Sequence, residues 1–180
     1  MNLIPKPLNF SCFVLLLIGG FTAHAHDPGL SSATITVRDR RIDVLLGFAQ
    51  RDVESLLGTY GGQVEIQSPE GFAAIQSRLE SLAAQETSIR LENTIAVLKQ
   101  TVAKWRDSQN IEILLSFERR NGSRLSLVSK LIERLPFGHR EFVSVETAAG
   151  VTLGESILSK DANSFQNRLA DHSELDRLSQ

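Results

Sequence analysis

Residues 111–118 read Ile-Glu-Ile-Leu-Leu-Ser-Phe-Glu, and this stretch decides the fold class of the chain. Apolar and polar side chains alternate along it, with the apolar ones at Ile111, Ile113, Leu115 and Phe117. A period of two places one face of a strand against a core and the other toward solvent. The stretch therefore predicts a half-buried β-strand.

Similar alternating segments recur along the chain, separated by turn residues. Residues 32–48 predict a β-hairpin, and residues 143–153 predict a second one. Asn121-Gly122 is typical of a tight turn and predicts a third hairpin, with residues 125–127 beginning the return strand. About eight short strands of this kind indicate an antiparallel β-sandwich, immunoglobulin-like in its general architecture.

One segment has helical spacing instead. Ser68 offers a side-chain acceptor, and Pro69 follows where no backbone donor is lost. Apolar residues then recur every three or four positions, which predicts one inserted α-helix at 69–84. Further upstream, Asp52 is expected to cap a short helical turn.

Residues 1–25 have the features of a cleaved signal peptide. Lys6 supplies positive charge, residues 10–23 are largely apolar, and small residues stand at Ala23 and Ala25. We therefore expect cleavage after Ala25 and a periplasmic or secreted protein. The expected mature chain is one domain at 26–169, followed by a polar tail at 170–180.

The composition of the expected mature chain excludes several classes of function. Its only cysteine, Cys12, leaves with the signal peptide, so no thiolate nucleophile or disulfide remains. Without Lys6 the chain has 18 basic and 21 acidic residues, interspersed, which argues against a nucleic-acid partner. No apolar run after Ala25 approaches the length of a transmembrane segment.

Cleavage after Ala25 would make His26 the first residue. Its free amine and its imidazole then form a two-nitrogen chelate, and such nitrogen ligands suit copper and nickel. Asp27 can add an oxygen ligand, and a third residue is needed to complete a site. His139 and His172 are the other mature histidines, and we take His26, Asp27 and His139 as the candidate metal ligands.

Catalytic motifs are scarce, which predicts that the chain is not an enzyme. It contains no Gly-x-Ser-x-Gly nucleophile elbow, and its serines follow no recognised triad order. A Ser-His-acid arrangement would need a coincidence of folding. Glu133 and Glu141 are expected to be solvated charges rather than an acid–base pair.

Two segments carry a family resemblance. Residues 26–31 read His-Asp-Pro-Gly-Leu-Ser, and residues 135–140 read Leu-Pro-Phe-Gly-His-Arg. Together they resemble the exported N-terminal domain of HupE/UreJ-like membrane proteins, here without the transmembrane bundle. The resemblance implies an exported β domain with a hydrogenase or urease accessory role, in a family associated with nickel or cobalt uptake.

These observations lead to one expected function and two alternatives. The leading hypothesis is a non-catalytic, exported accessory or interaction domain that presents copper or nickel through His26. The first alternative is a purely protein-binding module that docks on a separate membrane partner resembling a transporter. The second, weaker alternative is a hydrolase whose site the sequence does not reveal.

Overall fold

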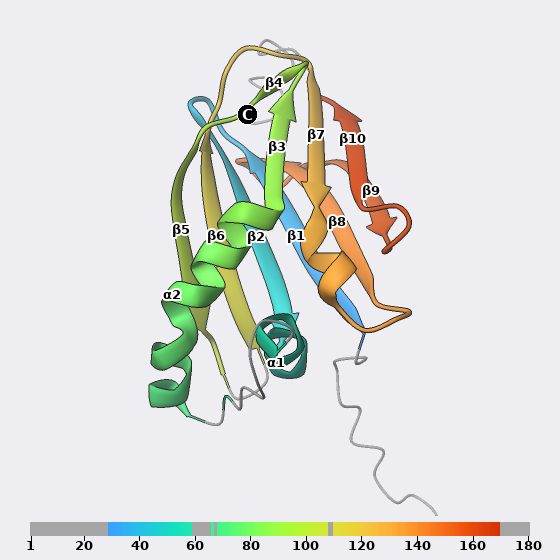
Figure 1. The fold of residues 1–180 in the computed structure, drawn as a ribbon. Helices are drawn as coiled ribbons and strands as arrows, with labels where there is room; N and C mark the ends of the chain where they lie inside the picture. Colours follow the sequence, from blue (N-terminus) through green and yellow to red (C-terminus); the bar gives the residue numbers. More distant parts are fainter. Residues whose placement is uncertain (1–28, 59–65, 67, 108–109, 170–180) are drawn as a thin grey trace, which may run out of the picture.

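The computed structural model describes residues 29–58, 66, 68–107 and 110–169, which form two β-sheets and two α-helices (Figure 1). The larger sheet has the strand order β5-β6-β2-β1-β8-β9, and the smaller has the order β10-β7-β3-β4. The strands are β1 (Leu30–Val37), β2 (Arg41–Ala49), β3 (Thr87–Leu91), β4 (Thr94–Ile95), β5 (Leu98–Trp105), β6 (Asn110–Glu118), β7 (Arg124–Ser129), β8 (Arg140–Thr147), β9 (Thr152–Leu158) and β10 (Ser164–Arg168). The helices are α1 (Gln50–Gly58), α2 (Pro69–Glu86) and the short 3-10 helix η1 (Lys130–Arg134).

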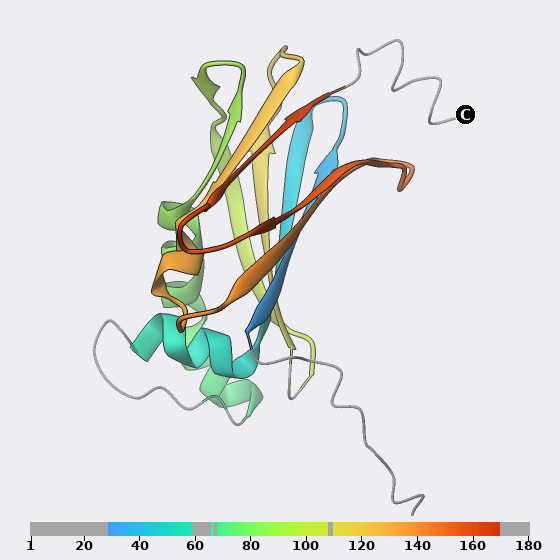
Figure 2. The same cartoon turned by 90° about the vertical axis from the view of Figure 1, so that its right-hand side faces the viewer.

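The core lies between the two sheets and beneath the helices. Along β6 the side chains of Ile111, Ile113 and Leu115 are fully buried and their neighbours are partly exposed, as the alternation predicts. Both helices lie on one side of the large sheet (Figure 2). The predicted mainly β, sandwich-like arrangement is confirmed at this level.

Helix α2 begins where the sequence predicts. The backbone N–H of Gly71 donates to the Ser68 hydroxyl at 3.1 Å, which satisfies one of the free donors at the helix start. Phe72, Leu79 and Leu82 are buried, and the helix packs on β5. It ends at Glu86, two residues beyond the predicted 69–84, and leads directly into β3.

The expectation of a wholly antiparallel sandwich is wrong at one strand pair. β1 and β8 are parallel, with Leu30 opposite Arg140 and Val37 opposite Thr147. The chain leaves the small sheet at the end of β7, passes through η1 and enters the large sheet beside β1. The six-stranded sheet is therefore mixed, whereas the small sheet is antiparallel.

The hairpin predicted at Asn121-Gly122 does not form either. β6 pairs with β2 and β5, whereas β7 pairs with β3 and β10, so this segment carries the chain from one sheet to the other. The carboxylate of Glu92 accepts hydrogen bonds from the backbone N–H groups of Ser123 and Arg124 at 2.8 and 2.9 Å. A long-range contact thus stabilises the segment that passes from one sheet to the other, where the local turn residues predicted a hairpin.

The structure has two α-helices, whereas the sequence predicted one α-helix and a short helical turn. Helix α1 is the additional α-helix. It starts at Gln50, so Asp52 lies in its first turn rather than at its cap. Val53, Leu56 and Leu57 face the core, and α1 closes the end of the sandwich at which β2 finishes (Figure 1). Among the described helices, none combines the length and the apolar character that crossing a membrane requires.

Candidate functional site

Three segments that lie far apart in the sequence meet at one end of the large sheet. Because β1 and β8 are parallel, their first residues lie side by side, and the N–H of Arg140 donates to the Gly29 carbonyl at 2.7 Å. β2 runs antiparallel to β1, so its last residues reach the same end and continue into α1. Ser31, Asp52 and His139 therefore come together.

His139 is held by a tight turn just before β8. Gly138 has φ +89°, a conformation that side chains disfavour, and the N–H of His139 donates to the Pro136 carbonyl at 3.2 Å. The turn folds the imidazole inward, leaving it only 3% exposed. Burial lowers the pKa of His139 below its ordinary value, so the ring is neutral near pH 7 and a nitrogen lone pair is available.

Both nitrogens of His139 face polar groups. Nε2 lies 3.0 Å from the hydroxyl oxygen of Ser31, within hydrogen-bonding distance. Nδ1 lies 3.7 Å from Oδ1 of Asp52, which is too long for a hydrogen bond, and Nδ1 has no other hydrogen-bond partner. Asp52 is only 6% exposed, and the first turn of α1 favours a carboxylate there.

Asp52 and His139 line an open cavity of about 620 Å³. Gly29 and Phe137 form part of its wall, together with the exposed residue Arg51. Ser31 is not among the residues that line this cavity, but it lines another cavity of about 660 Å³ together with Ser32 and Gly47. Asp52 and His139 therefore border this cavity and Ser31 does not, although Nδ1 of His139 is itself buried.

The arrangement has the composition of a Ser-His-Asp triad, although no sequence motif predicted one. The Ser31–His139 distance suits a nucleophile and its base. However, Ser31 is 3% exposed and does not line this cavity, and the His139–Asp52 distance is too long for the orienting hydrogen bond. The cluster therefore lacks the orienting hydrogen bond of a Ser-His-Asp triad.

The cavity supplies two candidate metal ligands in the part of the chain that the structure describes. No group of three or more His, Cys, Asp or Glu side chains occurs among those residues. Two ligand atoms that each lie roughly 2.0 to 2.2 Å from one metal ion are about 3.4 Å apart when the angle at the metal is tetrahedral. They are about 4.2 Å apart when they lie on opposite sides of the metal. The observed 3.7 Å between Nδ1 and Oδ1 falls within this range, but the described residues supply only these two ligands.

Of the three ligands predicted from the sequence, only His139 lies among the described residues, where it is paired with Ser31 and Asp52. His26 and Asp27 lie outside the described residues, and so does His172. No sequence pattern indicated that Asp52 and Ser31 belong to this cluster. The signal that could have found them is topological, because Ser31 lies at the start of β1, which pairs with β8, and Asp52 follows the end of β2, which pairs with β1.

Glu141 differs from its expected solvated state. It lies next to Ser31 across the parallel pair and is 1% exposed. Burial raises the pKa of Glu141 to about 7, and the hydroxyl of Ser129 offsets part of this rise. The polar cluster behind the cavity thus includes a carboxyl that titrates near neutrality.

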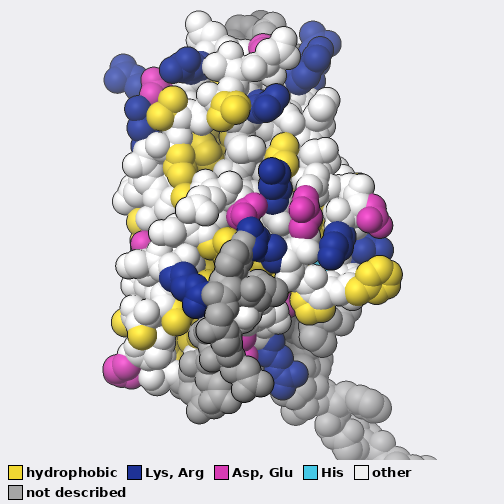
Figure 3. Space-filling view, in the orientation of Figure 1, with side chains coloured by type: hydrophobic (Ala, Val, Ile, Leu, Met, Phe, Trp, Pro, Cys, Tyr) yellow, Lys and Arg dark blue, Asp and Glu magenta, His cyan; other side chains and the backbone are white. Residues whose placement is uncertain are grey.

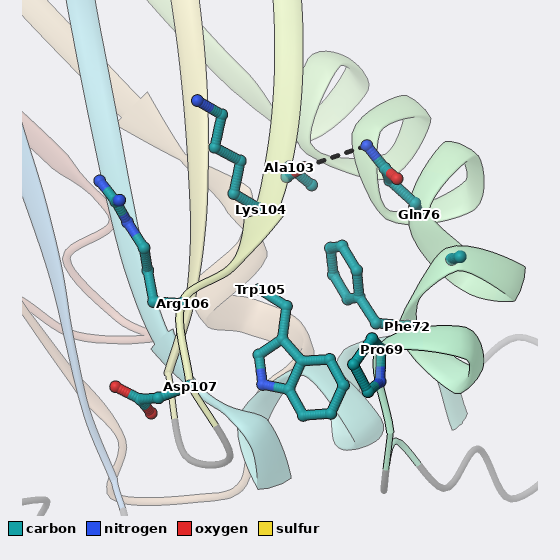
Figure 4. Close-up of a pocket in the computed structure, with 9 residues that line it drawn as sticks. Pro69, Phe72, Gln76, Ala103, Lys104, Trp105, Arg106 and Asp107 are labelled. Atoms are coloured by element: carbon teal, nitrogen blue, oxygen red, sulfur yellow. Dashed lines mark hydrogen bonds between the residues drawn. The ribbon is translucent and has the colours of Figure 1, made fainter.

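A second cavity, of about 690 Å³, lies where the start of α2 approaches the end of β5 (Figure 4). The rings of Phe72 and Trp105 form its apolar wall, with centroids 6.4 Å apart and planes tilted by 46°. The side-chain amide of Gln76 donates to the Ala103 carbonyl at 3.1 Å. This cavity gathers none of the predicted metal ligands.

Neither a protein-family model nor a curated protein matches the sequence. The residue roles therefore rest on the geometry given above.

Proposed function

We propose that the protein is a non-catalytic, exported accessory domain that holds copper or nickel at the cavity formed by Asp52 and His139. The observation that carries the proposal is the pairing of a buried carboxylate with an imidazole nitrogen that has no hydrogen-bond partner. The mature amino terminus at His26 would supply the amine and a second imidazole, with Asp27 as a further oxygen ligand. Imidazole, amine and carboxylate ligands together suit Cu(II) and Ni(II).

The length of the chain supports a contribution from His26. Gly29 lies in the wall of the cavity and contacts the residues that begin β8. Three residues of extended chain span roughly 10 Å, so His26 is within reach of Asp52 and His139. The positive charges of Arg51 and Arg140 disfavour a bound cation. Both side chains are exposed, so salt screens their electrostatic effect.

Titration with Cu(II) and Ni(II) by isothermal calorimetry tests this proposal. The chain beginning at His26 should bind at least tenfold more tightly than a chain with one additional residue before His26, because the extension removes the chelating amine. Asp52→Asn and His139→Ala should each weaken binding by at least tenfold, whereas His172→Ala is the matched histidine control. Equal affinity of the extended and unextended chains would rule out the amino-terminal chelate.

A second candidate function is docking on a separate membrane protein with a transporter-like bundle. Apolar side chains are exposed near the cavity end of β1, β8 and β9: Phe137 is 98% exposed, Ile157 62% and Leu30 47%. Phe142 and Ile157 are neighbours across β8 and β9, and Phe142 borders the Leu30 end of β1. Exposed apolar side chains that lie near one another are typical of interaction surfaces.

The resemblance to HupE/UreJ-like exported domains supports both candidates, because such domains accompany membrane bundles in a family associated with nickel or cobalt. We propose an immunoglobulin-like architecture only in the general sense of two packed sheets. We also propose a periplasmic or secreted location, from the features of residues 1–25. Basic and acidic side chains are interspersed on the face shown in Figure 3, which agrees with a partner other than nucleic acid. The hydrolase alternative is less favoured, because Ser31 is buried and the His139–Asp52 distance is too long for an orienting hydrogen bond.

A further inference from the structure

We propose that the outer face of the small sheet binds the surface of an anionic phospholipid membrane through Arg90, Arg124 and Arg168. This face lies away from the His139 cavity: Arg124 follows the end of β6, which pairs with the start of β2, whereas the cavity lies where β2 ends. The inference therefore concerns a second surface and does not depend on metal binding.

The three arginines lie on three adjacent strands, because β7 is placed between β10 and β3. Arg124 on β7 is directly opposite Arg168 on β10, and Arg90 on β3 is opposite Ser126, two positions further along β7. All three arginines are exposed, whereas Leu125, the next residue along β7, is buried in the core. Neighbouring strands are about 4.8 Å apart, so the three side chains leave one face within roughly 12 Å of one another.

The pairing of Arg124 with Arg168 lowers the stability of the sheet, because like charges directly opposite each other on neighbouring strands repel. The four strands β3, β4, β7 and β10 contain no acidic residue. Within the described part of the chain, none of the three arginines forms a salt bridge. An anionic surface laid against this face offsets the repulsion.

Glu92, in the turn that follows β3, is the acidic residue that interacts with this group. Its carboxylate accepts hydrogen bonds from the backbone N–H groups of Ser123 and Arg124 at 2.8 and 2.9 Å. Hydrogen bonds from Ser123 lower the pKa of Glu92 most, and the charge of Arg124 contributes least. Glu92 therefore serves mainly the backbone of the crossing segment, and the face keeps a surplus of positive charge.

Exposed apolar side chains beside the arginines favour a lipid surface over other anions. Ile95 on β4 is opposite Arg90 and is 57% exposed, and Val97, just after β4, is 40% exposed. Figure 3 shows this face, where basic and apolar side chains lie near one another at the upper end. At a membrane surface, burial of apolar side chains and attraction of basic ones to anionic lipids act together. A soluble polyanion offers no such burial to Ile95.

Co-sedimentation with lipid vesicles tests the inference on the chain beginning at His26, which lacks the apolar residues 10–23. The protein should bind vesicles of phosphatidylglycerol and phosphatidylcholine in equal parts, and should not bind phosphatidylcholine alone. Each basic side chain near an anionic surface strengthens binding about fivefold. The double variant Arg124→Gln/Arg168→Gln should therefore bind the mixed vesicles about 25-fold more weakly.

The matched control is Lys104→Gln/Lys130→Gln, which removes the same charge elsewhere. Lys130 follows the far end of β7, and Lys104 is opposite Glu112, near the far end of β6. Both therefore lie roughly 20 Å along the strands from the proposed surface, beyond the Debye length of about 10 Å. This variant should bind the mixed vesicles within about threefold of wild type, as expected for screened charges.

Ile95→Ser tests the lipid assignment and should weaken vesicle binding about tenfold, the effect of losing most of one buried apolar side chain. An unchanged affinity in Ile95→Ser, or tighter binding to a DNA duplex than to the mixed vesicles, would overturn that assignment. Absence of vesicle binding, equal binding to both vesicle types, or an unchanged affinity in Arg124→Gln/Arg168→Gln would overturn the inference as a whole.

Urea denaturation separates this role from a structural one. Because Arg124 and Arg168 repel each other, Arg124→Gln/Arg168→Gln should unfold at a urea midpoint no lower than that of wild type. A lower midpoint would show that the two arginines stabilise the sheet, and would contradict the reason given for a partner at this face.

Discussion

The buried carboxyl of Glu141 should make the stability of the metal-free protein depend on pH. Glu141 is 1% exposed on β8, and its Oε2 atom has no hydrogen-bond partner. Burial disfavours the charged form and raises the pKa of Glu141 to about 7, against 4.5 for an ordinary glutamate. The folded state therefore binds a proton that the unfolded state releases between these two values.

The sign and the size follow from this difference. Because the pKa of Glu141 is higher in the folded state, its favourable contribution is fully present below pH 4.5 and is lost as the pH rises through 7. One pKa unit corresponds to about 1.4 kcal/mol, so the full loss is about 3 kcal/mol, of which 2 to 3 kcal/mol falls between pH 5 and pH 8. This is a large part of the stability of an ordinary domain.

Urea denaturation at pH 5 and pH 8, with a chelator present, measures the effect. Glu141→Gln remains neutral throughout, so its free energy of unfolding should lack this loss of 2 to 3 kcal/mol, estimated from the raised pKa. Glu155→Gln removes an exposed carboxylate on the neighbouring strand β9 and should follow the wild-type profile. If Glu141→Gln loses as much stability as wild type over this range, the assignment of a buried neutral carboxyl is wrong.

Two further predictions concern the elements that the sequence pattern identified. Leu115→Asp should leave the chain unfolded by circular dichroism at 25 °C, because Leu115 is fully buried and an unpaired charge there costs several kcal/mol; Leu114→Asp, on the opposite face of β6, is the control and should remain folded. Ser68→Ala removes the acceptor for the Gly71 N–H and should lower the free energy of unfolding by about 1 kcal/mol, whereas an unchanged urea midpoint would show that the cap does not contribute.

Local patterns predicted the elements well because their causes are local. The alternation around Leu115 requires only that one face of a strand be buried, and the start of α2 requires only Ser68 and Pro69. The hairpin at β8 and β9 forms across Gly150, whose φ of +82° suits the turn. In each of these cases the residues that determine the structure lie within a few positions of one another.

Predictions failed where a distant partner overrides the local pattern. Asn121-Gly122 favours a hairpin, but Glu92, about thirty residues earlier, holds the following backbone against the other sheet. Glu141 has a charged side chain that is ordinarily solvated, yet the alternation of β8 directs it inward. Charge and turn propensity alone do not report which strands will become neighbours.

The failed prediction of a wholly antiparallel sheet also explains why the candidate site was incompletely predicted. His139 precedes β8, and Ser31 begins β1, so the parallel pairing of these strands brings the two side chains to the same end. An antiparallel β8 of eight residues would have placed His139 at the other end of β1, roughly 25 Å away at about 3.3 Å per residue. The position of Asp52 depends on the same topology, because β2 ends beside the start of β1 and α1 begins at that point. The cluster is therefore a consequence of strand order and direction, and a histidine that the sequence places in a turn acquires its partners only through the parallel pairing of β1 and β8.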